Sequence, residues 1–221
     1  MDLIKTILKL QFAEAFRPWL EMRNLMRVVA ENPSLELQGP PVVLDNERKR
    51  IRQVFQFRAY ILEQEGKDPL DTVTRGLDLI TKANEASPFP AIDQARYESI
   101  FIEPYALPFH ELVMLLKDRY LRPNPMVDSS TDIGLTFDQH DGEVVKHIQL
   151  GPMQVGQLRA MFLVWPRDEV PDQFVFISAG YERNRQTVFD PSFMRGFLEE
   201  AIQWQKEQVR TILDYLFDKG G

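Results

Sequence analysis

Five basic residues lie close together between positions 48 and 58. They are Arg48, Lys49, Arg50, Arg52 and Arg58. The guanidinium of arginine presents a planar fork of hydrogen-bond donors that matches the oxygens of a carboxylate or a phosphate. The cluster therefore indicates a surface that could hold an anion. A solvated loop that runs into a strand explains the same residues without any ligand.

The spacing of the candidates predicts how an anion site would be built. Arg52, Arg58 and Tyr60 are separated by even numbers of positions, so they share one face of an extended strand. Arg52 and Arg58 would be about 20 Å apart along that strand, which suits a long groove rather than one phosphate. Arg183 and Arg185 are the candidates from the second half of the chain. In the alternative, the basic face pairs with the acidic second half.

The remaining polar residues form no motif for catalysis or for metal binding. The segment DQHDGE around His140 lacks the ligand spacing of a calcium loop, and an Asp-Gly turn explains it. The chain has no Cys, no Gly-x-Ser-x-Gly elbow and no glycine-rich phosphate loop. The sequence therefore predicts no metal, no cofactor and no catalytic residue. A site assembled from distant positions would leave no such local signature.

The charge of the chain argues against two classes of partner. The 221 residues include 26 basic and 33 acidic side chains, which gives a formal net charge of −7. Residues 1–124 carry 17 basic and 18 acidic side chains, whereas residues 125–221 carry 9 and 15. Nucleic acids and anionic membranes need a positive surface, so neither is expected as a partner. The sequence shows no apolar run of membrane-spanning length and no signal-peptide pattern, so we expect a cytoplasmic protein.

Hydrophobic periodicity predicts the elements that would position the candidate residues in the first half. The expected elements are a strand at 4–12, a helix at 14–31, strands at 34–44 and 50–62, a helix at 68–87, a strand at 95–105 and a helix at 108–120. The first six have the order β-α-β-β-α-β. This is the ferredoxin-like order, in which two helices cover one face of an antiparallel sheet.

The second half is predicted to have the order β-β-β-β-α. The expected elements are strands at 132–139, 144–151, 156–165 and 172–183, followed by a helix at 191–217. The Asp-Gly pair at 141–142 predicts a hairpin between the first two. The fold class is therefore α+β, with an antiparallel sheet and helices mainly on one face. A Pro- and Ser-rich loop separates the predicted halves, 1–124 and 125–221, although one continuous sheet could join them.

The last helix suggests a function for the whole chain. Phe193, Phe197, Trp204 and Tyr215 widen its apolar stripe beyond what contact with one sheet requires. Together with the missing catalytic motifs, this favours a non-catalytic interaction or regulatory module that binds a protein partner or itself, as a homo-oligomer through residues 191–217. The alternative is a binder of a small anionic ligand, or an enzyme, with a site between the two halves.

Overall fold

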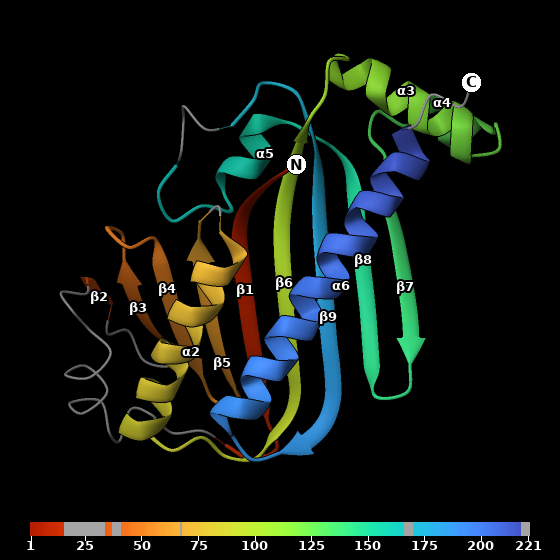
Figure 1. The fold of residues 1–221 in the computed structure, drawn as a ribbon. Coiled ribbons are helices and arrows are strands. Elements are labelled where there is room, and N and C mark those ends of the chain that lie inside the picture. Colours follow the sequence, from red (N-terminus) through yellow and green to blue (C-terminus); the bar gives the residue numbers. More distant parts are fainter. Residues whose placement is uncertain (16–33, 37–40, 67, 166–169, 218–221) are drawn as a thin grey trace.

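The computed structural model describes residues 1–15, 34–36, 41–66, 68–165 and 170–217 (Figure 1). The strands in these ranges form one antiparallel sheet in the order β2-β3-β4-β5-β1-β6-β9-β8-β7. The strands are β1 (Asp2–Phe12), β2 (Ser34–Glu36), β3 (Val42–Asn46), β4 (Ile51–Gln56), β5 (Ala59–Glu65), β6 (Ile92–Pro104), β7 (Leu135–Asp141), β8 (Val144–Met153) and β9 (Phe174–Thr187). The helices are α2 (Pro69–Ala86), α3 (Phe109–Tyr120), α4 (Pro125–Ser129), α5 (Val155–Arg159) and α6 (Pro191–Phe217). The predicted α+β class with an antiparallel sheet is confirmed.

The strand order is not the ferredoxin-like order that the sequence predicted. β1 lies inside the sheet and pairs antiparallel with both β5 and β6. Residues 50–62 form a hairpin of two strands, β4 and β5, joined by a turn at Phe57 and Arg58. This turn has none of the Gly, Asn or Asp residues that usually mark a two-residue hairpin, so the alternation looked like one long strand. Nearly all of the expected helix at 14–31 lies outside the described residues.

In the second half, most predicted elements are found. β7 and β8 form the expected hairpin around the Asp-Gly pair, where Gly142 has a φ of +59°. The helix expected at 191–217 has these bounds in the structure. The strand expected at 156–165 is wrong, because residues 155–159 form the short helix α5, which starts with a capping box between Gln154 and Gln157. β9 pairs with β6 along its length, so one sheet runs through both predicted halves.

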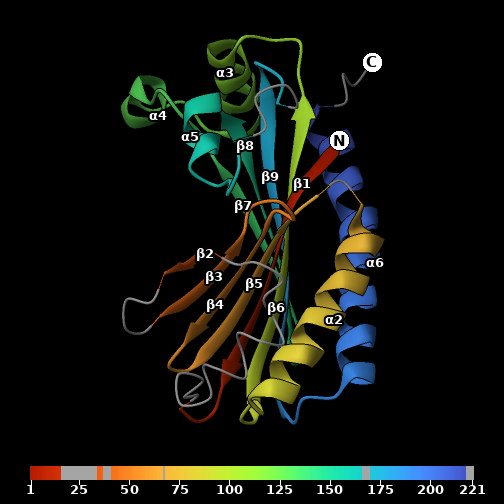
Figure 2. The same ribbon diagram turned by 90° about the vertical axis from the view of Figure 1, so that its left-hand side faces the viewer.

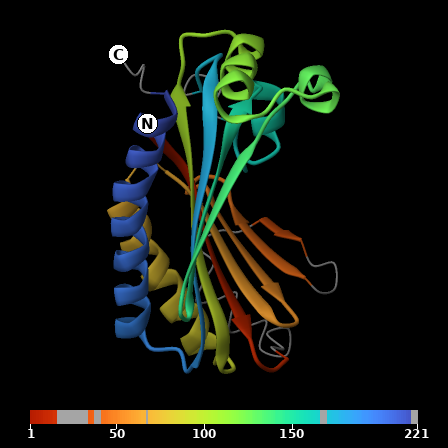
Figure 3. The ribbon, with the colours of Figure 1, turned by 90° about the vertical axis from the view of Figure 1, so that its right-hand side faces the viewer.

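The two long helices, α2 and α6, lie side by side on one face of the sheet (Figures 2 and 3). Under α2, a cluster of buried residues includes Phe12, Phe55, Tyr60 and Ile80. Gly76 lies where α2 packs on β5, since a Cβ there would lie 2.7 Å from Nε2 of Gln64 and 3.5 Å from Cδ2 of Leu62. The small helix α5 packs on the opposite face, over a separate apolar cluster.

The wide apolar stripe of α6 is used within the chain itself. Met194 and Phe197 belong to the cluster shared with α2, whereas Val209 and Leu213 belong to a second cluster shared with α3 and β8. Contact with two clusters requires a wide apolar face, which explains the stripe without a partner. Among the helices in the described ranges, none is both long and apolar enough to cross a membrane.

Candidate anion-binding site

The loop between β3 and β4 holds consecutive basic residues on an ordered turn. Asn46 ends β3 and pairs with Ile51, the first residue of β4. The Asn46 Oδ1 atom accepts a hydrogen bond from the backbone N–H of Lys49 at 3.0 Å. The backbone N–H of Arg50 donates to the carbonyl of Glu47 at 3.2 Å. These bonds fix the turn from which the cations of residues 48–50 extend.

Arg50 has an unusual backbone conformation at the end of this turn. Its φ is +53°, and it is the one residue other than glycine with positive φ in the part of the chain that the structure describes. The left-handed conformation costs an L-residue with a Cβ on the order of 1 kcal/mol, which is why Gly and Asn are preferred there. Arg50 therefore adds a charge to this loop at some cost in stability.

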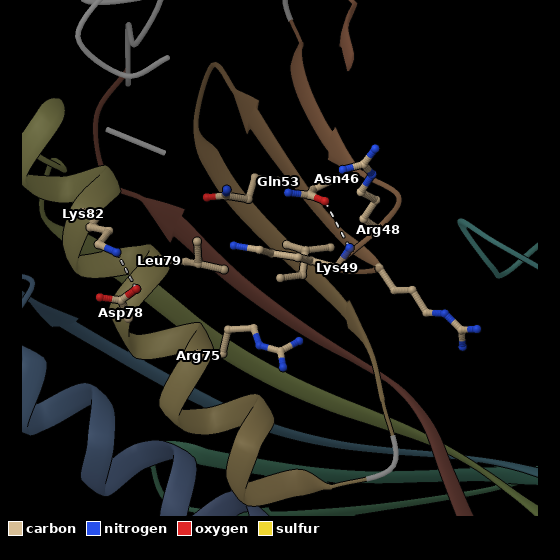
Figure 4. Close-up of a pocket in the computed structure, with 10 residues that line it drawn as sticks. Asn46, Arg48, Lys49, Gln53, Arg75, Asp78, Leu79 and Lys82 are labelled. Carbon is tan, nitrogen blue, oxygen red and sulfur yellow. Dashed lines mark hydrogen bonds and ion pairs between the residues drawn. The ribbon is translucent and has the colours of Figure 1, made fainter. Parts of the chain in front are cut away.

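Helix α2 supplies the opposite wall of a pocket (Figure 4). Arg75, Asp78, Leu79 and Lys82 follow the spacing i, i+3, i+4, i+7, so they share one face of the helix. Lys82 Nζ lies 2.7 Å from Asp78 Oδ2. The side chains of Lys49 and Arg75 extend toward each other from the two walls.

The pocket has a volume of about 420 Å³, within the range of small-molecule sites. Its lining consists of Asn46, Arg48, Lys49, Arg50, Ile51, Gln53, Arg75, Asp78, Leu79 and Lys82. Five of these residues are basic and one is acidic, a local excess of four positive charges on a chain with a net charge of −7. A hollow lined by charges of one sign concentrates ligands of the opposite sign. The site is therefore suited to an anion.

Arg52, the first predicted site residue, is next to the pocket residues in sequence but does not line the pocket. Its Nε atom donates to Asp45 Oδ1 at 2.8 Å, and Nη1 lies 4.0 Å from Glu63 Oε2. The hydrogen bond to Asp45 is the main reason that the pKa of Arg52 is raised above its usual value. Its guanidinium holds neighbouring strands together.

Arg58 and Tyr60 differ most from the sequence-based prediction. Arg58 lies in the turn and donates to the carbonyl oxygens of Phe12 and Ala13, which ties the hairpin to the end of β1. Tyr60 was expected on an open face with Arg52, and this is wrong because its side chain is fully buried. The two-residue turn pairs Phe55 with Tyr60, so both point into the core beneath α2.

Arg183 and Arg185 lie on β9, at a distance from the pocket. Three strands separate β9 from β4 in the sheet, which corresponds to about 19 Å. Arg183 donates to Glu200 Oε2 on α6 at 2.6 Å and lies 5.9 Å from the centre of the Phe197 ring. Arg185 is exposed. The structure therefore does not bring the five predicted residues together in one place.

A second hollow, of about 470 Å³, runs along α6 and has the opposite charge. It is lined by Lys146, Tyr181, Glu199, Glu200, Gln203, Trp204 and Glu207. Glu200 already accepts hydrogen bonds from Arg183 and from the Tyr181 hydroxyl. The pKa of Tyr181 is raised, first by burial and then by the charge of Glu200. This hollow is thus partly neutralised by residues of the chain itself.

Two pairs of polar side chains on the strands β6 to β9 are hydrogen-bonded to each other. His147 Nδ1 is hydrogen-bonded to Asp138. The Ser178 hydroxyl donates to Glu98 Oε1 at 2.6 Å, so it contacts a carboxylate rather than a histidine base. Within the described ranges, no group of three or more His, Asp and Glu side chains could hold a metal ion.

The sequence singled out one wall of the pocket and missed the other. Arg48, Lys49 and Arg50 belonged to the basic cluster, but Arg75 and Lys82 did not. The one indication in the sequence that Arg75 and Lys82 belong together was their common position on the polar face of α2. No protein-family model matches the chain, and no curated protein is significantly similar to it.

Proposed function

We propose that this protein is a non-catalytic binding or regulatory module whose effector is a small anionic ligand, held between the β3–β4 loop and α2. The excess of basic side chains around this pocket is the observation that carries the proposal. Charge-assisted hydrogen bonds from Lys49 and Arg75 would hold the anion from two sides. The apolar surface of Leu79 and Ile51 would contact the rest of the ligand.

Isothermal titration calorimetry of the full chain with phenyl phosphate measures the dissociation constant and tests this proposal. We expect binding that weakens as salt is added, because the interaction is between opposite charges. Arg75→Ala removes one hydrogen bond to a charged group and should weaken binding about tenfold or more. Arg185→Ala is the matched control, since it removes an exposed arginine far from the pocket. If Arg75→Ala binds as tightly as the unaltered protein, the pocket is not the site.

Self-association through residues 191–217 stays a prediction. Most apolar side chains of α6 pack inside the chain, although Tyr215 near its end is 72% exposed. Sedimentation velocity at high protein concentration tests this prediction directly. A protein that remains strictly monomeric there does not use α6 as an interface.

A further inference from the structure

Gln53 is a polar residue at a position of β4 where the pattern calls for an apolar one. Its neighbours on the same face, Ile51 and Phe55, are buried, and Gln53 itself is only 4% exposed. It nevertheless lines the basic pocket (Figure 4). An amide buried to this extent is costly unless its polar atoms have partners. One of those partners is supplied by the core of the protein.

The buried hydroxyl of Tyr60 fixes the orientation of the Gln53 amide. It donates to Gln53 Oε1 at 2.7 Å. The Tyr60 ring is held in the aromatic core by Phe55 and Phe89, with ring centroids 5.1 Å and 5.4 Å away. Burial raises the pKa of Tyr60 far above the usual 10, so the hydroxyl keeps its proton and remains a donor. The amide oxygen is therefore held toward the core.

With Oε1 held, Nε2 is the remaining polar atom of the Gln53 side chain. No residue in the described ranges accepts a hydrogen bond from Nε2. An amide NH₂ group can donate two hydrogen bonds. Gln53 thus brings a neutral donor to a pocket in which five of the other lining residues are basic.

Two side-chain acceptor atoms of the pocket lining are engaged within the chain. Asp78 accepts from Lys82 at 2.7 Å, and Asn46 Oδ1 accepts from the backbone of Lys49. The loop, the helix and the strand each contribute donors to this pocket. A ligand rich in hydroxyl donors would find little to pair with, whereas a group with several anionic oxygens would satisfy all three elements.

We propose that Gln53 is the specificity-determining residue of this pocket, and that Tyr60 is its positioning residue. Gln53 Nε2 donates to a phosphoryl group whose other oxygens contact Lys49 and Arg75. A phosphate monoester has three terminal oxygens and carries close to two negative charges, whereas a carboxylate has two oxygens and one charge. Three sets of donors therefore favour a phosphate monoester over a carboxylate. This inference rests on the proposed anion-binding function.

Titration of matched probes tests the inference. Phenyl phosphate and benzoate share a phenyl group and differ in the anionic group. The unaltered protein should bind phenyl phosphate at least tenfold more tightly than benzoate. Gln53→Met keeps the side-chain length but removes the donor, and should weaken phenyl phosphate binding about 10- to 100-fold. Benzoate binding should change less, so that the selectivity falls.

Tyr60→Phe provides a second variant in which Gln53 is still present. Without the hydroxyl the amide can turn over, so phenyl phosphate binding should weaken a few-fold and the preference over benzoate should shrink. A purely structural role for Tyr60 would lower the melting temperature and leave this preference unchanged. If Gln53→Met does not fold, the selectivity of Tyr60→Phe decides the question.

The outcomes separate this inference from the proposed function. If neither probe binds the unaltered protein, the proposed function fails and the inference fails with it. If phenyl phosphate binds and Arg75→Ala weakens it, but Gln53→Met and Tyr60→Phe keep the selectivity, the pocket is an anion site and Gln53 does not determine its specificity.

Discussion

The two long helices share one face of the sheet, yet they border hollows of opposite charge. α2 contributes Arg75 and Lys82 to a pocket with five basic residues and one acidic residue. α6 contributes Glu199, Glu200 and Glu207 to a hollow with a single lysine in its lining. The contrast follows the sequence, since residues 1–124 are nearly neutral and residues 125–221 hold most of the net negative charge.

The two hollows also differ in how their charge is balanced. Near α6, Arg183 and Lys146 offset part of the acidic charge, and Arg183 is itself held over aromatic rings. At α2, the single acid of the lining, Asp78, is paired with Lys82. The lining of the pocket therefore has the larger excess of one sign of charge, five basic residues against one acidic residue. We therefore expect substitutions around α2 and substitutions around α6 to differ in their effects on stability and on anion binding.

The largest expected effect is on the free energy of unfolding, and it concerns the buried side chains by which each helix packs on the sheet. Phe197 on α6 is fully buried and contacts Tyr181, with ring centroids 5.8 Å apart. Phe197→Ala should lower the free energy of unfolding by about 3–5 kcal/mol, and Ile80→Ala on α2 by about 2–5 kcal/mol. Urea denaturation measures both. A loss below about 1 kcal/mol for either variant would contradict the packing described for that helix.

Charge reversal in the pocket should have the next largest effect. Lys49→Glu combined with Arg75→Glu replaces two attractive contacts by repulsion, and should weaken phenyl phosphate binding at least 100-fold, or about 2.8 kcal/mol. Glu199→Lys combined with Glu207→Lys changes the charge of the α6 hollow by the same number of units in the opposite direction. Because salt screens charges that do not touch the ligand, this control should change the affinity less than about threefold. An affinity that rises 100-fold or more in the Glu199→Lys, Glu207→Lys control would mean that net charge, rather than the pocket, governs binding.

Removal of Arg183 tests the internal compensation at α6. Arg183→Ala loses a partly exposed ion pair with Glu200 and a cation–π contact, each worth up to about 1 kcal/mol. We expect a loss of about 1 kcal/mol in the free energy of unfolding. Arg195→Ala, at an exposed position of α6, should stay within about 0.5 kcal/mol of the unaltered protein. Similar values for the two variants would show that Arg183 contributes nothing beyond an exposed charge.

Substitution of Arg50 should separate stability from binding. Arg50→Asn suits the left-handed conformation better and should raise the free energy of unfolding by up to about 1 kcal/mol, while it weakens phenyl phosphate binding. Arg48→Asn removes a charge from the same loop without relieving strain, so its stability should not change. A chemical denaturation curve and a titration of each variant give both quantities. Loss of stability in Arg50→Asn would be the contrary result.

The smallest effect concerns Glu65, whose backbone N–H donates to the carbonyl of Arg50. Burial raises the pKa of Glu65 above its usual 4.5, although the backbone N–H of Leu163 and the charge of Lys5 oppose this. The native state therefore holds the proton more tightly than the unfolded state. The associated stability is complete below pH 4.5 and is lost as the pH rises through the raised pKa.

Glu65→Gln removes this titration and keeps a side chain of the same shape. The free energy of unfolding of the unaltered protein should fall relative to that of Glu65→Gln as the pH rises above 4.5. Denaturation of both proteins across this pH range measures the difference. Parallel profiles would show that Glu65 has no raised pKa in the native state.

Several elements could be predicted because their signals are local. Asp68-Pro69 marks the start of α2, and an uninterrupted apolar stripe gives the bounds of α6. The Asp-Gly pair marks the β7–β8 turn, where Gly142 takes a positive φ. In each case the residues that fix the conformation are neighbours in the chain.

Two errors arose where local signals were weak or misleading. The Phe57-Arg58 turn has no residue suited to positive φ, so the β4–β5 hairpin looked like one strand and Tyr60 was placed on the wrong face. The apolar segment at 156–165 has a strand-like composition, but its first residues form a capped helical turn. Pairing with β1 and packing of α5 on the sheet decided these conformations.

The sequence by itself determined the basic cluster at 48–52, the acidic second half and the absence of cysteine chemistry, because these are properties of composition and of short spacing. Only the tertiary structure placed Arg75 opposite Lys49 and the Tyr60 hydroxyl against Gln53. These contacts join residues of different elements: the first depends on how α2 packs on the sheet, and the second on the pairing of β4 with β5. Such packing is set by the whole core rather than by any one segment, which is why the pocket could not be predicted from the chain alone.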